Sequence, residues 1–212
     1  MVGVEQQTEI AAAFIGVARH RLRRDGKGVT TLAAFHSCSL HCKYCLNPAC
    51  LDNKRAFPQY TPQQLYDKIS IDNLYFLATG GGVCFGGGEP LLHADFICRF
   101  REICVEDWKI TLETALNVPL ENLKTAAAVS DAFIVDIKDC NDAIYQLYTG
   151  KSNRLSLSNL EWLLQNAGAE RITVRVPLIP DFNTEEDRQR SVEQLQSMGV
   201  KQVDLFTYKV SK

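Results

Sequence analysis

The sequence predicts a single α/β domain, a partial (β/α)6 TIM-like barrel. Short apolar runs alternate with amphipathic stretches along its 212 residues, which is typical of βαβ units around a parallel sheet. Most of these runs are continuously apolar, as expected of strands that are covered on both faces. A complete eight-unit barrel takes about 250 residues, so six units in 212 residues indicate an open barrel.

The predicted strands are six apolar runs separated by longer amphipathic segments. They lie at residues 29–35, 82–85, 109–114, 132–137, 171–177 and 203–206. Ligands of such sheets bind at the carboxyl ends of the strands. Motifs that carry function are therefore expected directly after these runs.

The predicted helices have recognisable ends. Three Ser or Thr residues are followed three positions later by Gln, Glu or Asp, the pattern of a capping box. These pairs are Thr61 with Gln64, Ser158 with Glu161, and Thr184 with Asp187. Helices are accordingly expected after Thr61, at 160–166 and at 185–198, and Gly168 and Gly199 stand where the last two end. Two more helices are expected at 93–106 and 120–129.

Charge and cysteine content narrow the class of protein. With 23 Lys and Arg against 25 Asp and Glu, the net charge of −2 gives no electrostatic basis for nucleic-acid binding. No secretory signal is visible and the apolar stretch at 10–18 is too short to span a membrane, so a cytoplasmic protein without membrane contact is expected. Eight cysteines in such a protein indicate a metal or redox centre rather than disulfides.

Three of the cysteines follow the first predicted strand in a CxxxCxxC pattern: Cys38, Cys42 and Cys45. Iron–sulfur clusters are held by Cys thiolates, normally four. Three protein thiolates leave one iron open for a substrate or cofactor, much as a catalytic zinc keeps an open position. The pattern therefore indicates a metal centre that does chemistry. Simply buried thiols are not expected in a loop that also contains His, Lys and Ser.

A structural zinc site is the alternative at this loop. Structural zinc is nearly always four-coordinate, so it needs a further ligand from His36, His41 or Cys50. Cys50 is the nearest thiol, but Pro48 and the intervening turn are expected to carry it away from the loop. On this alternative the protein is a zinc-stabilised binding module without catalysis.

A glycine-rich segment, 79–90, ends the second predicted strand. It lacks the Lys-Ser/Thr of a P-loop and the spacing of a dinucleotide fingerprint, so a phosphate cradle is not indicated. Glycines at 86–88 allow backbone groups to approach a ligand closely. Glu89 supplies a carboxylate that can form a charge-assisted hydrogen bond with an amino group.

These two motifs together resemble those of the radical S-adenosylmethionine (SAM) superfamily. The cysteine loop, with Tyr44 before its third Cys, resembles the loop whose open iron chelates SAM. Gly87, Gly88 and Glu89 resemble the GGE motif that binds the SAM amino group. The resemblance implies one [4Fe–4S] cluster on the three cysteines and SAM as cofactor. No side chain is then expected to act as a general acid or base.

Further segments resemble one group of this superfamily, the activating enzymes of glycyl radical enzymes. The matching segments are 24–28, 44–48, 80–90, 112–114, 135–138, 141–153, 175–181 and 205–209. Lys27 stands where a Pro is usual, and Lys209 stands where a His contacts the nucleoside. The resemblance covers about Phe14 to Lys209, nearly the whole chain. The predicted domain is 1–212, with 1–28 as an N-terminal extension and substrate-loop region and 29–209 as the partial barrel.

The resemblance also implies residue roles. The expected SAM contacts are Tyr44, Leu46, Gly87, Gly88, Glu89, Glu113, Lys138, Arg175 and Lys209. A monovalent cation is expected on Glu113, Thr114, the carbonyl of Ile134 and Asp136. Asp25, Gly26 and Asn47 are expected to hold the substrate loop of a protein partner.

The implied reaction cleaves SAM reductively to methionine and a 5′-deoxyadenosyl radical. That radical abstracts a hydrogen atom from a glycine Cα of a large glycyl radical enzyme such as pyruvate formate-lyase, with a flavodoxin- or ferredoxin-type protein as electron donor. Two other enzymatic readings stay open: an activase of anaerobic ribonucleotide reductase, and a radical SAM enzyme acting on a small molecule or peptide. The chain ends at Lys212, before the tail usual in this group, so an open mouth for the partner is expected.

The stretch from Arg19 to Arg24 is basic, and the resemblance gives it no role. It is either a solvated face or a surface for an acidic partner. Four other cysteines are expected to pack as small apolar residues. They are Cys84, Cys98, Cys104 and Cys140.

Overall fold

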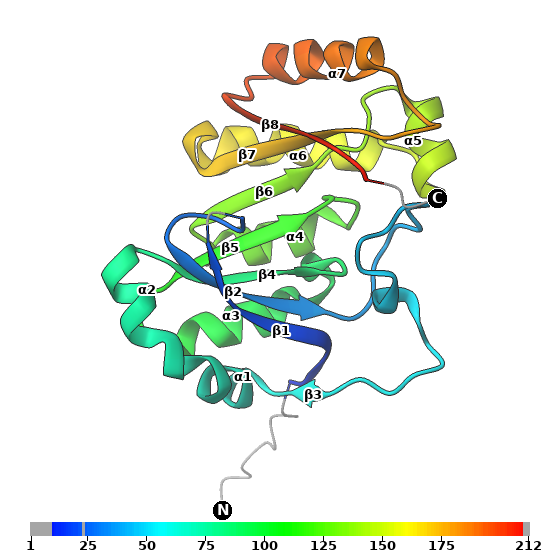
Figure 1. Cartoon of the computed structure of the whole chain (residues 1–212). Coiled ribbons are helices and arrows are strands. Elements are labelled where there is room, and N and C mark those ends of the chain that lie inside the picture. Colours follow the sequence, from blue (N-terminus) through cyan, green and yellow to red (C-terminus); the bar gives the residue numbers. More distant parts are fainter. Residues whose placement is uncertain (1–9, 23, 210–212) are drawn as a thin grey trace, which may run out of the picture.

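The structure, a computed structural model, describes residues 10–22 and 24–209 and contains one sheet of eight strands. The strands are β1 (Ala12–Leu22), β2 (Val29–Phe35), β3 (Gln59–Tyr60), β4 (Gly82–Gly87), β5 (Lys109–Thr114), β6 (Ala132–Asp136), β7 (Ile172–Leu178) and β8 (Gln202–Thr207). Their order in the sheet is β3-β1-β2-β4-β5-β6-β7-β8 (Figure 1). The six strands from β2 to β8 in this order are parallel, and β1 is antiparallel to both of its neighbours. The sheet is open, with β3 and β8 as its edges.

All six predicted strands are present, but β1 and β3 were not predicted. Part of the region expected as an N-terminal extension is therefore a strand of the sheet. The apolar start of β1 gives way to the polar run from Arg19 to Arg21, so the sequence shows neither a continuous apolar run nor a clean alternation. β3 has only two residues, too few for any pattern.

Aromatic rings hold β1 on the parallel strands. Phe14 of β1 stacks on Phe35 of β2 with ring centroids 4.4 Å apart, and Phe35 stacks on Phe85 of β4 at 5.5 Å. Helix α3 (Ala94–Ile103) adds Phe96, whose ring lies 5.5 Å from those of Phe14 and Phe35. All four rings are buried, so β1 shares one core with the barrel strands.

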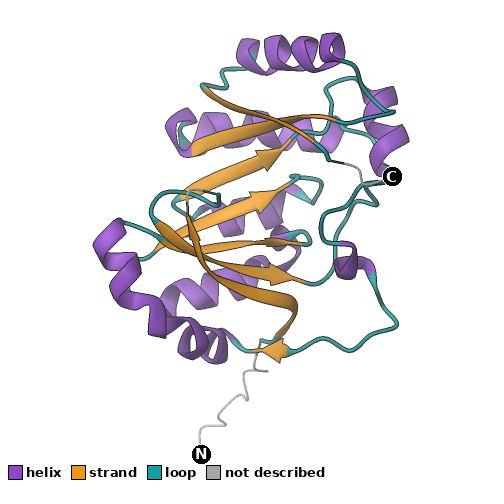
Figure 2. Ribbon diagram, viewed as in Figure 1, coloured by secondary structure: helices purple, strands orange, loops and turns teal. Residues whose placement is uncertain are grey.

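The helices surround the outside of the sheet (Figure 2). Besides α3 they are α1 (Pro62–Ile69), α2 (Asn73–Thr79), α4 (Leu120–Ala127), α5 (Asp142–Thr149), α6 (Arg154–Ala167) and α7 (Glu185–Ser197). The capping boxes at Thr61 and Thr184 are formed as predicted. The one expected at Ser158 is wrong, because α6 begins at Arg154 and Ser158 lies inside it. α2 and α5 were not predicted. None of the described helices is long and apolar enough to cross a membrane.

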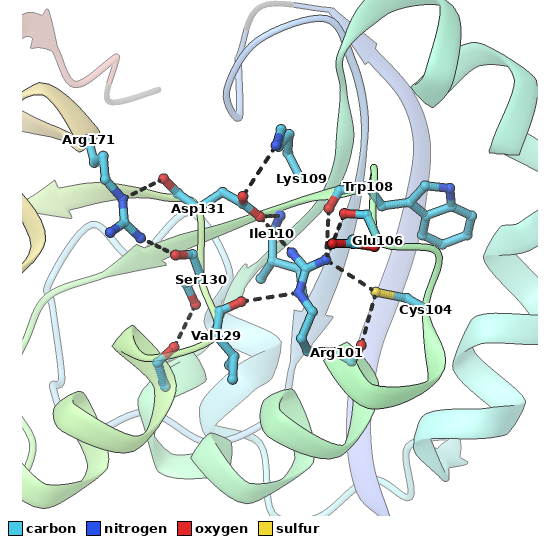
Figure 3. A network of polar contacts seen from close by, with 11 residues as sticks. Arg101, Cys104, Glu106, Trp108, Lys109, Ile110, Val129, Ser130, Asp131 and Arg171 are labelled. Carbon is cyan, nitrogen blue, oxygen red and sulfur yellow. Dashed lines mark hydrogen bonds and ion pairs between the residues drawn. The ribbon is translucent and has the colours of Figure 1, made fainter.

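A polar network fixes the amino ends of β5, β6 and β7 (Figure 3). Asp131, just before β6, binds Arg101 of α3 at 2.6 Å and accepts a hydrogen bond from the Ile110 N–H at 2.8 Å. Its carbonyl accepts a hydrogen bond from Arg171 at 2.9 Å. Because each charged group has a partner, this end of the barrel keeps a defined shape around the cavity described below.

Candidate functional site

A cavity lies at the carboxyl ends of the parallel strands, where the sequence places the motifs. We call it the carboxyl-end cavity. Its walls come from the cysteine loop, the glycine-rich segment and the ends of β5, β6 and β8. The lining residues are Cys38, Leu40, Cys42, Cys45, Leu46, Asn47, Gly87, Gly88, Glu89, Glu113, Thr114, Ala115, Asp136, Lys138 and Tyr208.

The three cysteines of the CxxxCxxC pattern share this cavity, and each is partly exposed. Burial raises the pKa of the Cys42 thiol to about 11. Hydrogen bonds with the Cys50 thiol lower the pKa of Cys38, and lower that of Cys45 to about 6. Three partly exposed thiols on one cavity wall are the donor set of a cluster with one open iron.

Cys50 lies beside this loop, so the expectation that it is carried away is wrong. A single turn of 3-10 helix, Pro48–Leu51, folds the chain back toward the cysteines. The Cys50 carbonyl accepts a hydrogen bond from the Ser37 N–H at 2.8 Å, and its thiol is buried against Cys38 and Cys45. Within the described chain, no group of three or more His, Cys, Asp or Glu side chains is spaced to hold a single metal ion.

Glu89 is buried between β4 and β5 and is fully hydrogen-bonded. It accepts from the Thr114 hydroxyl at 2.6 Å, from the Ala115 N–H at 3.0 Å and from the Leu91 N–H at 3.1 Å. Burial raises the pKa of this carboxyl group to about 7, although the three hydrogen bonds oppose the shift. The carboxyl group is therefore held rigidly at the cavity wall, and near neutral pH its charged and neutral forms differ little in free energy.

Two glycines before Glu89 are required by the strand next to them. Gly87 has φ +87°, and a Cβ on Gly88 would stand 2.0 Å from the Ser37 carbonyl oxygen. The Gly88 N–H donates to the Phe35 carbonyl at 2.9 Å and the Glu89 N–H donates to the Ser37 carbonyl at 2.8 Å. The glycines thus let the ends of β2 and β4 come together, which brings Glu89 up to the cysteine loop.

A buried ion pair faces the same cavity from the end of β6. The Lys138 ammonium lies 2.9 Å from Asp136 Oδ2 and 3.3 Å from the Tyr208 hydroxyl. Burial by itself would lower the pKa of Lys138, but Asp136 and Tyr208 raise it well above its ordinary value. Asp136 Oδ1 is buried without a hydrogen-bond partner among the described residues. The pair therefore offers a ligand both a fixed positive charge and an open carboxylate oxygen.

An ion pair joins Glu113, in the wall of this cavity, to Arg175. Their ion pair measures 2.7 Å, and Arg175 also donates to the Arg24 carbonyl at 2.7 Å. Burial and the nearby charge of Asp136 raise the pKa of Glu113. Glu113 lines the carboxyl-end cavity, whereas Arg175 lines a second cavity on the other side.

That second cavity opens at the amino ends of the strands and has a volume of about 580 Å³. Lys109, Ala132 and Gln202, each the first residue of its strand, are among its lining residues. The hairpin loop between β1 and β2 reaches into it with Arg24, Gly26 and Lys27. We call it the amino-end cavity.

The structure brings most of the expected site residues together, with some exceptions. Tyr44 points to Asp181, to which its hydroxyl donates at 3.0 Å, and does not line the cavity. Arg175 and Ile134 line the amino-end cavity instead. Lys209 is exposed, and the buried Tyr208 occupies the wall beside it. The sequence reasoning missed Tyr208, although it follows inward-facing Phe206 by two positions, the strand period.

The three residues expected to hold a substrate loop do not meet. Asn47 donates to the Gly87 carbonyl at 3.2 Å, at the carboxyl ends of the strands. Gly26 lines the amino-end cavity, and Asp25 is buried next to it and paired with Arg21. Asn47 is thus part of the cluster-side wall.

Residues 33–195 match the sequence profile of the Radical SAM superfamily. The chain belongs to the radical SAM superfamily. Members use a [4Fe–4S] cluster and SAM, so the expected cluster and SAM are confirmed at the level of the family. The match covers the cysteine loop and every lining residue of the carboxyl-end cavity except Tyr208. It sets aside the zinc-stabilised binding module in favour of a radical SAM enzyme.

Curated relatives of this radical SAM enzyme confirm the narrower resemblance. It is 28 % identical over 186 residues to a pyruvate formate-lyase-activating enzyme of Clostridium pasteurianum, covering 87 % of this chain and 77 % of the relative. It is 28 % identical to a choline trimethylamine-lyase activating enzyme of Oleidesulfovibrio alaskensis (87 % and 79 %) and 30 % identical to a trans-4-hydroxy-L-proline dehydratase activating enzyme of Clostridioides difficile (71 % and 51 %).

Among solved structures, Streptococcus suis SuiB bound to S-adenosylmethionine has a TM-score of 0.64 at 13 % identity. The similarity covers 83 % of this chain and 39 % of SuiB. At this identity it shows the fold alone.

Proposed function

We propose that this radical SAM enzyme activates a glycyl radical enzyme. The observation that carries the proposal is the carboxyl-end cavity, which unites three cluster-loop thiols with Glu89 and the Lys138 ammonium. The curated relatives named above, each an activating enzyme, support the same reaction class. The substrate is a protein that presents the Cα–H bond of one glycine to the enzyme.

The residues of this cavity fit the cluster and SAM. Cys38, Cys42 and Cys45 would hold the cluster, which when reduced supplies the electron that cleaves SAM to methionine and a 5′-deoxyadenosyl radical. Glu89 would accept a hydrogen bond from the SAM amino group, because its carboxylate is fixed at the wall next to the loop. Lys138 would hold the SAM carboxylate with its buried ammonium.

A monovalent cation is proposed beside SAM. Asp136 Oδ1 has no described partner and Glu113 lies in the same wall, so two carboxylates can share a cation that relieves their repulsion. Thr114 donates its hydroxyl to Glu89 and keeps lone pairs for the cation. The Ile134 carbonyl belongs to the proposed set by the resemblance alone, because Ile134 lines the amino-end cavity.

The glycine of the partner would enter through the amino-end cavity. Cluster and SAM would take up the carboxyl-end cavity, and the Glu113–Arg175 pair joins the wall of this cavity to that of the amino-end cavity. A peptide loop in the amino-end cavity would therefore approach SAM from the amino ends of the strands. Gly26 lines this cavity and the buried Asp25 lies next to it, in the loop that by resemblance helps to hold the peptide substrate.

The proposal includes a cytoplasmic location and a flavodoxin- or ferredoxin-type electron donor. The location is supported by the free thiols, since an open cluster needs a reducing compartment. The electron donor rests on the resemblance to the activating enzymes. An activase of anaerobic ribonucleotide reductase and an enzyme acting on a small molecule or peptide are the alternatives that the test must separate.

The test is anaerobic reconstitution followed by substrate trials. The reconstituted enzyme should be brown and, after reduction, convert SAM to methionine and 5′-deoxyadenosine. It is then incubated with a panel of pyruvate formate-lyase, choline trimethylamine-lyase, trans-4-hydroxy-L-proline dehydratase and anaerobic ribonucleotide reductase. We expect an electron paramagnetic resonance signal of a glycyl radical in one of the first three. A signal only in the reductase, or SAM cleavage with no radical in any protein, would overturn the proposal.

A further inference from the structure

Helix α2 has an apolar face that no described residue covers. Ile71, just before the helix, is 70 % exposed, and Leu74 in it is 79 % exposed. Tyr75 and Leu77 are exposed as well, and only Phe76 of α2 is buried. Four of the eleven large apolar side chains exposed in the described chain thus lie within seven consecutive residues. Single exposed apolar residues are ordinary, but a contiguous group of them marks an interaction site.

This face continues onto the hairpin of β1 and β2. The His20 and Tyr75 rings lie edge to face with centroids 5.0 Å apart, and the Val29 N–H donates to Thr79 Oγ1 at 2.9 Å. Leu22, at the end of β1, pairs with Val29 in the sheet and is 67 % exposed. We call Leu22, Ile71, Leu74, Tyr75 and Leu77 the α2 patch.

The basic stretch of the hairpin holds this face in place. Arg19 and His20 both bind the buried carboxylate of Asp72, which immediately precedes α2, at 2.5 Å and 2.9 Å. Arg21 pairs with Asp25 instead, and Arg23 lies outside the described residues. Arg19 and His20 therefore have a structural role. The sequence alone had left the basic stretch as either a solvated face or a surface for an acidic partner.

The α2 patch borders the mouth of the amino-end cavity. Gly80, which caps α2, lines that cavity together with the exposed side chains of Arg24 and Lys27. Five basic and three acidic side chains line the cavity, although the whole chain has a net charge of −2. The basic ones are Arg24, Lys27, Lys109, Arg171 and Arg175, and the acidic ones are Asp131, Glu170 and Asp204. The cavity lining thus carries a net positive charge next to an apolar surface, and we call its rim with the exposed Arg24 and Lys27 the positive mouth.

We propose that the α2 patch and the positive mouth together form the docking surface for the folded protein substrate. This inference rests on the proposed function. The matching surface of the partner is apolar and is surrounded by Asp and Glu side chains near the loop that carries its glycine. Burial of the α2 patch supplies affinity, and the charges of the mouth orient the partner.

Geometry favours this occupant over a second copy of the chain. A glycine loop that fills the amino-end cavity leaves the body of its protein outside the mouth. The surface that this body meets first is the α2 patch, since Gly80 belongs both to the cap of α2 and to the cavity wall. A second copy seated on the patch would stand in the way of that loop.

The test separates docking from chemistry by comparing two substrates. One is the panel protein in which the wild-type enzyme forms a radical, and the other is a short peptide that contains its radical glycine. The variant is Ile71→Gln/Leu74→Gln, whose substituted side chains are exposed and touch neither cavity. The matched control is Leu147→Gln on α5, where the leucine is 63 % exposed and lies outside the patch.

We expect the double variant to form the glycyl radical in the whole protein about tenfold more slowly, the effect of losing two central apolar contacts. Its turnover of the peptide and its SAM cleavage without substrate should stay at the wild-type level, which also shows that it is folded. Raising the ionic strength should slow wild-type activation of the whole protein and leave the peptide reaction unchanged.

Four outcomes would overturn the inference. Equal loss with Leu147→Gln, equal loss on peptide and protein, or no loss on the protein would each contradict docking at the α2 patch. A wild-type dimer in analytical ultracentrifugation that the double variant converts to a monomer would assign the patch to a second copy. If the wild-type enzyme forms no radical in any panel protein, the proposed function itself is contradicted. That result is distinct from the four outcomes above, the first three of which require an active wild-type enzyme.

Discussion

Glu89 is the best-defined single residue of the site. It is fully buried, it accepts three hydrogen bonds, and it joins the ends of β4 and β5 at the cavity wall. Its carboxylate is at the same time disfavoured by burial, which raises its pKa to about 7. A carboxylate in this state gains most from a ligand that brings a hydrogen-bond donor or a positive charge.

The raised pKa of Glu89 predicts that the free energy of unfolding of the cofactor-free protein falls as the pH rises. Because the pKa of Glu89 is raised in the folded state, its contribution to stability is full below its ordinary pKa and is lost as the pH rises through about 7. Glu89→Gln mimics the neutral acid, so between pH 5 and pH 8 the wild type should lose up to about 3 kcal/mol relative to the variant. Anaerobic urea unfolding at several pH values measures this. Parallel curves would contradict it.

The four thiols near the loop should differ in iron binding. Cys38, Cys42 and Cys45 line the cavity, whereas Cys50 is buried behind two of them. Each of the three replaced by Ala should abolish the cluster, while Cys50→Ala should retain about four irons per chain. Iron analysis and the visible spectrum after anaerobic reconstitution decide this. Loss of iron in Cys50→Ala would make Cys50 a ligand.

At this scale, residues inside contiguous motifs were predictable and residues placed by strand register were not. The cysteine loop, Glu89 and Lys138 were found from short patterns. Tyr208 was missed in favour of Lys209, because a shift of one residue at the end of a strand exchanges the inward and outward faces. Cys50 was misplaced because the turn of 3-10 helix that returns it has no distinctive sequence.

The contact between the ends of β2 and β4 positions the site. It depends on Gly88, whose missing side chain leaves room for the Ser37 carbonyl. We expect Gly88→Ala to destabilise the protein by about 3 kcal/mol, because the clash is with backbone and neither segment can move freely. Gly16→Ala is the control, since nothing lies within 4 Å of a Cβ there, and it should change stability little. Urea unfolding of both variants tests the difference.

α2, one of the elements that the sequence patterns missed, has no amphipathic period. α2 buries only Phe76 and carries apolar residues on its exposed side, so its sequence does not distinguish a helix from a strand. The capped helices α1 and α7 were found because their capping boxes are local in sequence. What placed α2 is tertiary contact through Asp72, which no local pattern encodes.

On the scale of the whole molecule, the barrel has two cavities, and one ion pair joins a lining residue of each. Glu113 and Arg175 meet at 2.7 Å, with the cluster-side thiols on one side and the positive mouth on the other. The predicted partial barrel implied a site at one end of the strands. The second opening depends on how far the hairpin of β1 and β2 reaches into the barrel, which follows from the antiparallel pairing of a strand that was not predicted.

The two cavities predict the route of the substrate. Thr173 of β7 is half-buried in the wall of the amino-end cavity and does not line the carboxyl-end cavity. Thr173→Trp should fill part of the amino-end cavity and leave reductive SAM cleavage at the wild-type rate. Radical formation should fall about tenfold or more, since a misplacement of about 1 Å already costs about a hundredfold when reacting atoms must be aligned.

The loss should be equal for the whole protein and for the short peptide, because both must enter the same cavity. This equal loss distinguishes Thr173→Trp from the α2-patch variant, which should lose activity on the whole protein and keep it on the peptide. Ser197→Trp, at an exposed position at the end of α7, is the control for the added bulk. Electron paramagnetic resonance and 5′-deoxyadenosine analysis give the two rates. If Thr173→Trp forms the radical as fast as wild type, the glycine loop enters from the cluster side, past the cysteine loop, and the amino-end cavity has no part in its path.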